Sequence, residues 1–200
     1  MRKLALAAVL LALVHAPAVA AESEGDAKVA QLHQEHPELG FLFFDVTLLR
    51  DGRPACTVET ATLTSNTGKR ALVDVFTGSL FSSRITCGAL ASLEPAVWTI
   101  ALVKCINSTF VGPFAHFRIE PGEIVNAGNL IVDVYTIRPK GLFNGAIYGA
   151  RATVEDLPAA SIESLQARAP ATFAKAKRRY FAASTTPKQV GPAPTSPATR

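Results

Sequence analysis

The part of this 200-residue chain that decides its fold is FAHFRIEPGEIVNAGNLIVDVYTI, residues 114–137. Its first half alternates, so that Phe117 and Ile119 point to one side and the polar residues between them to the other, as in a half-buried strand. The Pro-Gly pair at 121–122 suits a type II turn, because proline fixes φ and glycine supplies a positive φ. A second apolar run follows at 130–137. The stretch therefore predicts two strands joined through a tight turn.

Similar short runs recur on both sides of this stretch and predict a mainly β protein. In the run 97–103, Trp98, Ile100 and Leu102 are expected to share one face. No helical segment of useful length separates the runs, which disfavours a parallel sheet with crossover helices. We predict an antiparallel β-sandwich of about seven or eight strands over residues 40–156, followed by a C-terminal α-helical segment. The expected strands are residues 41–49, 56–63, 71–76, 97–103, 114–120, 123–126, 130–137 and 147–154.

Two motifs in this domain resemble a group of bacterial proteins. The stretch 117–130, with its Pro-Gly-Glu turn, looks like a motif of uncharacterised bacterial envelope or periplasmic proteins. Residues 93–100 resemble the segment that leads into one of their strands. Ala96 stands where a glycine is usual in that group, and Asn126 where an aromatic residue is common. The resemblance implies a transthyretin-like or immunoglobulin-like sandwich, and it brings no catalytic residues with it.

The first twenty residues have the pattern of a secretory signal. Arg2 and Lys3 precede the apolar run 4–14, and small residues lead up to Ala20. That run is too short to span a membrane, which takes about 20 residues. We expect cleavage near Ala20, a periplasmic or secreted protein, and no membrane-spanning segment in the mature chain. Residues 21–39 are predicted to be a polar lead, either flexible or forming one short helix.

After the strands, the pattern changes to that of a helix. Apolar residues recur at steps of three and four from Ile162 to Tyr180, and Pro170 is expected to kink this helix or to begin a second one. We therefore predict an amphipathic basic helix or helix pair over residues 157–183. The Pro-, Thr-, Ser- and Ala-rich residues 184–200 are predicted to be a disordered tail.

Charge is divided unevenly along the chain. Residues 164–200 carry seven basic and no acidic residues, whereas residues 21–163 carry all 16 acidic residues. The basic segment therefore either packs on the acidic body or docks to an envelope protein, an acidic polymer or a lipid surface. Nucleic acid is not an expected partner of an exported protein. The candidate docking residues are Lys175, Lys177, Arg178 and Arg179.

Three cysteines in an exported chain predict one disulfide and one remaining thiol. We expect the pair Cys87–Cys105, which would bracket a loop and a strand. The main alternative is Cys56–Cys105. In either case the remaining cysteine is expected to be a buried small hydrophobe rather than a reactive group.

The sequence offers little to support catalysis. It contains no nucleophile elbow and no phosphate-binding glycine loop, and its serines have no histidine nearby in the sequence. His33 and His36 could share one helix face and hold a metal, but the ligand set is incomplete. We expect a non-catalytic envelope protein with a binding or supporting role and without a cofactor. The alternatives are an exported hydrolase whose site is not visible in the sequence, and a metal-handling protein that uses His33 and His36.

Overall fold

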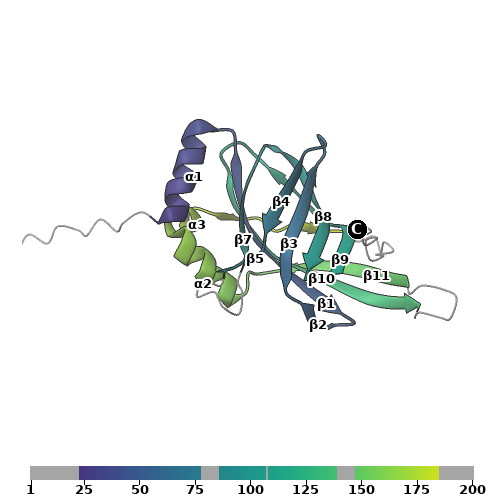
Figure 1. The fold of residues 1–200 in the computed structure, drawn as a ribbon. Coiled ribbons are helices and arrows are strands. Elements are labelled where there is room, and N and C mark those ends of the chain that lie inside the picture. The colour runs from purple at the N-terminus through teal and green to yellow at the C-terminus, as the bar shows by residue number, and fades with distance from the viewer. Residues whose placement is uncertain (1–22, 78–85, 107, 139–146, 185–200) are drawn as a thin grey trace, which may run out of the picture.

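The computed structural model describes residues 23–77, 86–106, 108–138 and 147–184. The expected signal peptide at 1–20 lies outside these residues, as does the predicted tail beyond Ser184. The described part of the chain is mainly β, with thirteen strands in three sheets and three helices (Figure 1). A mainly β protein with a C-terminal helix is therefore confirmed. The strand number is higher than seven or eight, because five strands of only two to four residues add to the long ones.

The larger sheet has six strands in the order β11-β10-β1-β2, with β7 also pairing with β1 and β12 with β10. These strands are β1 (Gly40–Arg50), β2 (Arg53–Cys56), β7 (Ala89–Leu93), β10 (Ile124–Arg138), β11 (Ile147–Glu155) and β12 (Lys177–Arg178). The expectation of a purely antiparallel arrangement is wrong here, because β1 and β10 run parallel. A parallel pair needs a long connection, and strands of the second sheet lie between β1 and β10 in the chain.

The second sheet has five antiparallel strands in the order β13-β9-β8-β3-β4. They are β3 (Val58–Ser65), β4 (Arg70–Asp74), β8 (Ala96–Cys105), β9 (Ser108–Ile119) and β13 (Ala182–Ala183). A two-stranded sheet of β5 (Phe76–Thr77) and β6 (Thr86–Cys87) completes the described strands.

Side chains from both larger sheets form one apolar core. Trp98 and Ile100 of β8 are buried in it, as predicted. Leu102 is not buried, which corrects its predicted face: relative to β3, strand β8 has one extra residue between Ile100 and Leu102, and this bulge turns Val103 into the core instead. An extra residue at a bulge reverses the side of every residue that follows it.

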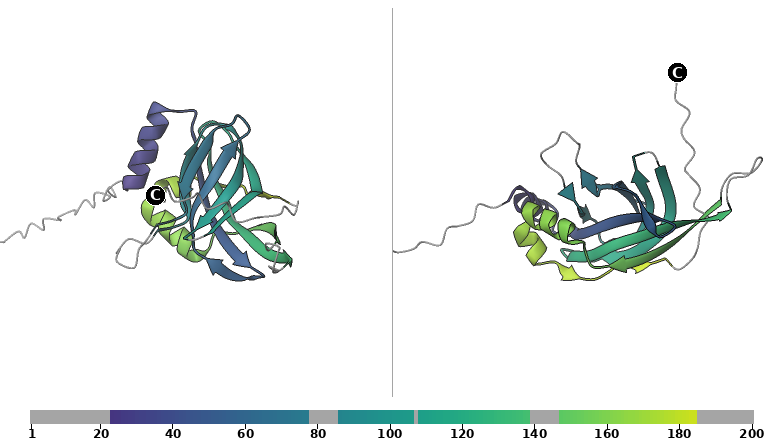
Figure 2. Two further views of the ribbon diagram at one scale, coloured as in Figure 1. Left: turned by 45° about the vertical axis from the view of Figure 1, so that its right-hand side comes forward. Right: turned by 90° about the horizontal axis from the view of Figure 1, so that it is seen from below.

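Three helices gather at one end of the sheets (Figure 2). They are α1 (Glu24–Glu35), α2 (Ala159–Arg168) and α3 (Pro170–Ala174), so the polar lead contains a short helix and Pro170 begins a helix of its own. Phe173 of α3 packs edge-on against Phe43 of β1, with ring centroids 5.1 Å apart. Among the described residues, no helix combines the length and the apolar character that crossing a membrane requires.

Beyond Ala174 the predicted helix is wrong, because the chain becomes extended. We call Lys177–Ala183 the C-terminal strap. Its first strand, β12, joins the six-stranded sheet and its last, β13, joins the five-stranded sheet. Between them Phe181 is buried, and its ring packs edge-on against Phe44 and Phe117 at centroid distances of 5.7 and 5.2 Å. The strap therefore ties the two sheets together.

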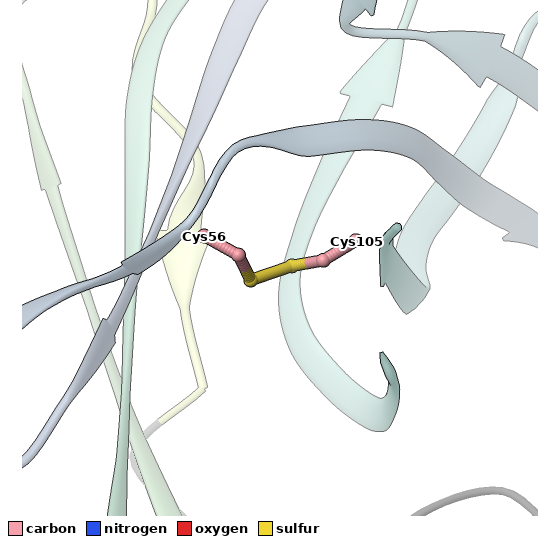
Figure 3. The surroundings of a disulfide bond; sticks show 2 residues. All are labelled: Cys56 and Cys105. Atoms are coloured by element: carbon pink, nitrogen blue, oxygen red, sulfur yellow. A yellow bond between two sulfur atoms is a disulfide. The ribbon is translucent and has the colours of Figure 1, made fainter. Parts of the chain in front are cut away.

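The disulfide joins Cys56 and Cys105, which was the alternative pairing, and leaves Cys87 as the free thiol (Figure 3). The expected bond between Cys87 and Cys105 is wrong. Cys56 ends β2 and Cys105 ends β8, so the bond connects the two larger sheets directly. Cys87 lies instead in β6 of the small sheet, opposite Phe76.

Candidate functional site

A cleft of about 630 Å³ lies between α1, α3 and the start of β1 and β10. We call it the α1 cleft. Phe41 and Ile124 contribute from the two strands, and Val29 and Ala30 contribute from α1. The remaining lining residues are Asp26, His33, Gln34, Gly122, Ala171, Thr172 and Lys175. The cleft is therefore mainly apolar on its sheet side and polar at its ends.

The start of α1 is fixed by a side-chain cap. Ser23 occupies the N-cap position, and its hydroxyl accepts a hydrogen bond from the backbone N–H of Asp26 at 3.1 Å. The same hydroxyl lies 2.8 Å from the carbonyl oxygen of Arg168, at the end of α2. A Cβ at Gly25 would collide with that carbonyl group, so only glycine permits this close approach of the two helices.

Asp26 joins α1 to α3. Its carboxylate accepts hydrogen bonds from the backbone N–H groups of Ala171 and Thr172 at 3.0 and 2.8 Å, and from the Thr172 hydroxyl at 2.6 Å. It thus supplies, from a different helix, the cap that the α3 N-terminus needs. Burial alone raises the pKa of Asp26, but these hydrogen bonds together with Ser23 outweigh it and hold the pKa below its ordinary value. The Asp26 carboxylate therefore serves to hold α3 against α1, although it borders the cleft.

The rest of α1 is weakly attached. Asp26 is the one buried residue of this helix, and Val29 and Leu32 are only half-buried. A helix that buried an apolar stripe would show several covered positions at steps of three and four. Instead, α1 is held at its first turn and through the chain entering β1, and the cleft lies beneath its middle.

Two nitrogen-bearing side chains border the cleft. Lys175 follows α3 directly and makes no ion pair with any other described residue. His33 lies against the 121–122 turn, where Gly122 adopts the positive φ of 64° that the Pro-Gly pair predicts. The Asp26 carboxylate stays ionised but its oxygens are taken up by donors of α3, so Lys175 is the charged group of the cleft that is free to contact a ligand.

The four candidate docking residues do not form one free patch. Arg179 makes an ion pair with Glu123 at 2.7 Å, and Arg178 makes one with Asp156 at 3.0 Å. Lys177 and Arg178 pair through the backbone with Val125 and Asn126 of β10. Of the four, Lys175 alone lines the α1 cleft.

The two candidate metal ligands have different surroundings. His33 lies at the cleft, whereas His36 caps the end of α1 and approaches Glu38, with 3.4 Å between Nδ1 and the carboxylate. The part of the chain that the structure describes contains no group of three or more His, Cys, Asp or Glu residues placed to hold a metal ion. His33 and His36 thus lack a third ligand there.

A second polar cluster lies under α2, beside a cavity of about 310 Å³. Asp45 accepts hydrogen bonds from the Ser161 hydroxyl and from the backbone N–H of Val46. Burial raises the pKa of Asp45 despite these hydrogen bonds. Burial also raises the pKa of the Cys87 thiol, and the nearby Asp45 carboxylate adds to that effect. Ser161 is 2% exposed and Cys87 is a poor thiolate former, so neither is placed as an accessible nucleophile.

Sequence reasoning missed Asp26, although a signal for it exists. Ser23 and Asp26 are three residues apart, which is the spacing of a capping box at a helix start. Asp45 also had a signal, since it is the one charged residue inside the apolar run 41–49. The contact between Asp26 and α3 joins residues about 145 positions apart, which a local pattern does not encode.

Comparisons of the chain with protein-family models, with curated protein sequences and with solved structures found no match. The candidate site is therefore argued from its own geometry.

Proposed function

We propose that this chain is an exported, non-catalytic binding protein of the bacterial envelope that holds a small anionic amphiphile in the α1 cleft. The single observation that carries the proposal is the cleft itself, with its apolar sheet side and with Lys175, which makes no ion pair among the described residues. Export is supported by the signal-like first twenty residues and by the Cys56–Cys105 disulfide, since disulfides persist in oxidising compartments. The shared core of the two larger sheets supports a β-sandwich body of the kind that the resemblance implies.

The size and lining of the cleft favour a small molecule. Ligand sites commonly enclose about 300–1,000 Å³ and combine an apolar surface with a few polar groups. The cleft has about 630 Å³, with Phe41 and Ile124 from the sheet and Val29 from α1. A short acyl chain lying on these side chains would be shielded from water on two sides.

The charge at the cleft favours an acidic head group. Asp26 keeps its negative charge but has its carboxylate oxygens covered by donors of α3, so an acidic head group is expected to lie beside Lys175 and away from Asp26. Lys175 and His33 remain to face a carboxylate or a phosphate. A charge-assisted hydrogen bond of this kind is stronger than a neutral one.

We assign the C-terminal strap a structural role, which favours packing on the body over docking. Its two arginines are paired with carboxylates of the body, and Phe181 is buried between the sheets. Truncation after Glu163 would remove α3 and the strap together, so it would test folding rather than docking. Single charge-neutralising substitutions separate the two roles.

Catalysis is the less favoured reading. Ser161 is buried and already bonded to Asp45, and burial raises the pKa of Cys87. A hydrolase site would need an exposed nucleophile beside a base. Neither Ser161 nor Cys87 meets that requirement.

Titration of the mature protein with decanoate, followed by isothermal calorimetry, tests the proposal. Ala30→Phe fills the cleft and is expected to weaken binding about tenfold or more, equivalent to about 1.4 kcal/mol. Ala27→Phe is the matched control, because Ala27 is also exposed on α1 but does not line the cleft. Its affinity is expected to stay within about twofold of the original.

The head group is tested in the same titration. Lys175→Gln is expected to weaken the binding of decanoate by about threefold, since an exposed ion pair contributes about 0.2–1 kcal/mol. The affinity for decanol, which has no charge, is expected to stay unchanged. Lys177→Gln lies two residues further on and outside the cleft, so it is expected to change the affinity for neither ligand. Failure of decanoate to bind, or equal binding by the Ala30→Phe and Ala27→Phe proteins, would overturn the proposed function.

A further inference from the structure

A polar groove of about 410 Å³ lies between β4 of the five-stranded sheet and β7 of the six-stranded sheet. Residues 71–74 and 90–92 of the two strands line it, together with Arg168 at the end of α2. Cα atoms of the two strands come within 8 Å of each other. An inserted strand needs about 9.6 Å, which is twice the usual strand spacing. The groove therefore suits a small molecule rather than a further strand.

Arg168 brings a half-buried positive charge to this groove. Its Nη2 donates a hydrogen bond to the carbonyl oxygen of Gly88 at 2.6 Å. Its Nε is buried and has no hydrogen-bond partner among the described residues. Because a guanidinium has five N–H donors, the bond to Gly88 leaves most of them without a protein partner. Burial lowers the pKa of Arg168, since the charged form has lost part of its hydration.

The positive charge of Arg168 is not balanced by a carboxylate in the described part of the chain. Arg168 takes part in none of the ion pairs that the described residues form. The sequence between β5 and β6, residues 78–85, contains no acidic residue. A cation that is partly removed from water and lacks a counter-ion is unfavourable. An anion in the groove would supply that counter-ion.

Asp74 brings a negative charge to the same groove. Its side chain is exposed on β4, and it forms no ion pair with Arg168 or with another residue that the structure describes. Ser92 of β7 adds an exposed hydroxyl, whereas Leu72 and Leu90 add apolar surface. One groove thus presents a cation and an anion that do not pair with each other.

We propose that this groove binds a free α-amino acid, with the carboxylate of the ligand on Arg168 and its ammonium group on Asp74. A guanidinium is suited to a carboxylate, because its planar donors form two parallel hydrogen bonds with the two oxygens. The apolar surface of Leu72 and Leu90 favours a ligand with an aliphatic side chain. The groove shares no lining residue with the α1 cleft, so the inference does not depend on the proposed function.

Calorimetric titration of the mature protein with free leucine tests the inference. N-acetylleucine keeps the carboxylate but has no charged amine, whereas leucinamide keeps the amine but has no carboxylate. Each is expected to bind at least about threefold more weakly than leucine, because each leaves one charge of the groove without a partner. Leucinamide is expected to lose more, since Arg168 is less exposed than Asp74. Ala30→Phe, which fills the α1 cleft, is expected to leave leucine binding unchanged.

Substitutions on the two walls test the assigned contacts. Arg168→Gln is expected to weaken leucine binding about tenfold, because a charge-assisted hydrogen bond is lost. Its matched control is Arg70→Gln, since Arg70 is exposed on β4 but does not line the groove. Asp74→Asn is expected to weaken binding about threefold, and Glu94→Gln, an exposed acid outside the groove, is its control. Both controls are expected to stay within about twofold of the original affinity.

Because Arg168 also bonds to Gly88, a further variant keeps both charges and this bond. Ser92→Phe narrows the groove from the exposed side of β7 and is expected to weaken leucine binding about tenfold. Circular dichroism of each variant separates loss of binding from loss of the fold. Absence of leucine binding, equal affinities for the three compounds, or normal binding by a folded Ser92→Phe or Arg168→Gln protein would each overturn the inference.

Discussion

Helix α1 and the C-terminal strap both flank the β body, but they are attached to it in opposite ways. The strap pairs with both large sheets and buries Phe181 against Phe44 and Phe117. Helix α1 buries Asp26 alone and leaves a cleft beneath its middle. The strap is therefore part of the core structure, whereas α1 is the more loosely packed element, and the proposed function places the ligand beneath it.

The difference shows that a run of basic residues in this sequence does not by itself mark a free basic surface. The basic run at 175–179 is the strongest local signal in the sequence, yet Arg178 and Arg179 are paired with Asp156 and Glu123. The polar lead at 21–39 carries no comparable signal. It nevertheless forms one wall of the α1 cleft, because Asp26 fixes its helix to α3.

The largest expected effect is on the strap. Phe181→Ala is expected to lower the free energy of unfolding by about 3–5 kcal/mol, because it leaves a cavity between the two sheets. Urea unfolding monitored by the fluorescence of Trp98 measures the loss. Tyr180→Phe is the control, since Tyr180 is 40% exposed and loses only its hydroxyl bond to Asp156. A loss below about 1 kcal/mol for Phe181→Ala would mean that the strap is not part of the core.

A smaller effect on stability is expected at Asp26, which joins α1 to α3. Asp26→Ala removes the cap of α3 and leaves buried N–H donors without a partner, at a cost of about 2–3 kcal/mol. Lys28→Ala, on the exposed side of α1, is expected to change stability by less than about 0.5 kcal/mol. Thermal unfolding of the two variants makes this comparison. Equal stability of both would contradict the role of Asp26.

The contribution of Asp26 to stability is also expected to depend on pH. Because the pKa of Asp26 is lower in the folded state, its contribution is present above the ordinary Asp value of about 3.9 and is lost as the pH falls through the folded-state pKa. The difference in stability between the original protein and Asp26→Ala is therefore expected to shrink below about pH 4. A difference that grows in acid would contradict the sign of the shift.

The smallest effects are expected from the paired arginines of the strap. Arg179→Gln is expected to cost about 0.5–1 kcal/mol, and Arg178→Gln less, because the Arg178–Asp156 pair is more exposed than the Arg179–Glu123 pair. Neither substitution is expected to change decanoate binding. Urea unfolding and calorimetry measure the two properties separately. A large loss of ligand affinity in either variant would mean that the strap takes part in ligand binding.

Strands in which apolar and polar residues alternate could be predicted from the sequence. Phe117 and Ile119 of β9 are buried as their spacing indicates, and the Pro121-Gly122 turn joins β9 to β10. The face of Leu102 could not be predicted, because the extra residue that β8 has relative to β3 leaves no mark in the local pattern of β8.

Features that depend on distant residues were also beyond local reasoning. The disulfide joins cysteines 49 positions apart, and its partner choice depends on how the two large sheets meet. The apolar spacing of the strap continues that of 162–173 and so predicts a helix, whereas pairing with β9 and β10 overrides that preference. The α1 cleft needs three separate segments to come together, so the sequence indicates only two of its residues, Lys175 as a docking candidate and His33 as a metal candidate.

Hydrogen exchange of the intact mature protein, with and without decanoate, tests the contrast between the two regions most directly. We expect amides of residues 24–35 to exchange faster than those of 177–183, and decanoate to slow exchange in α1 while it leaves the strap unchanged. Protection of the strap by decanoate, or a strap that exchanges as fast as α1, would contradict the contrast between the two regions.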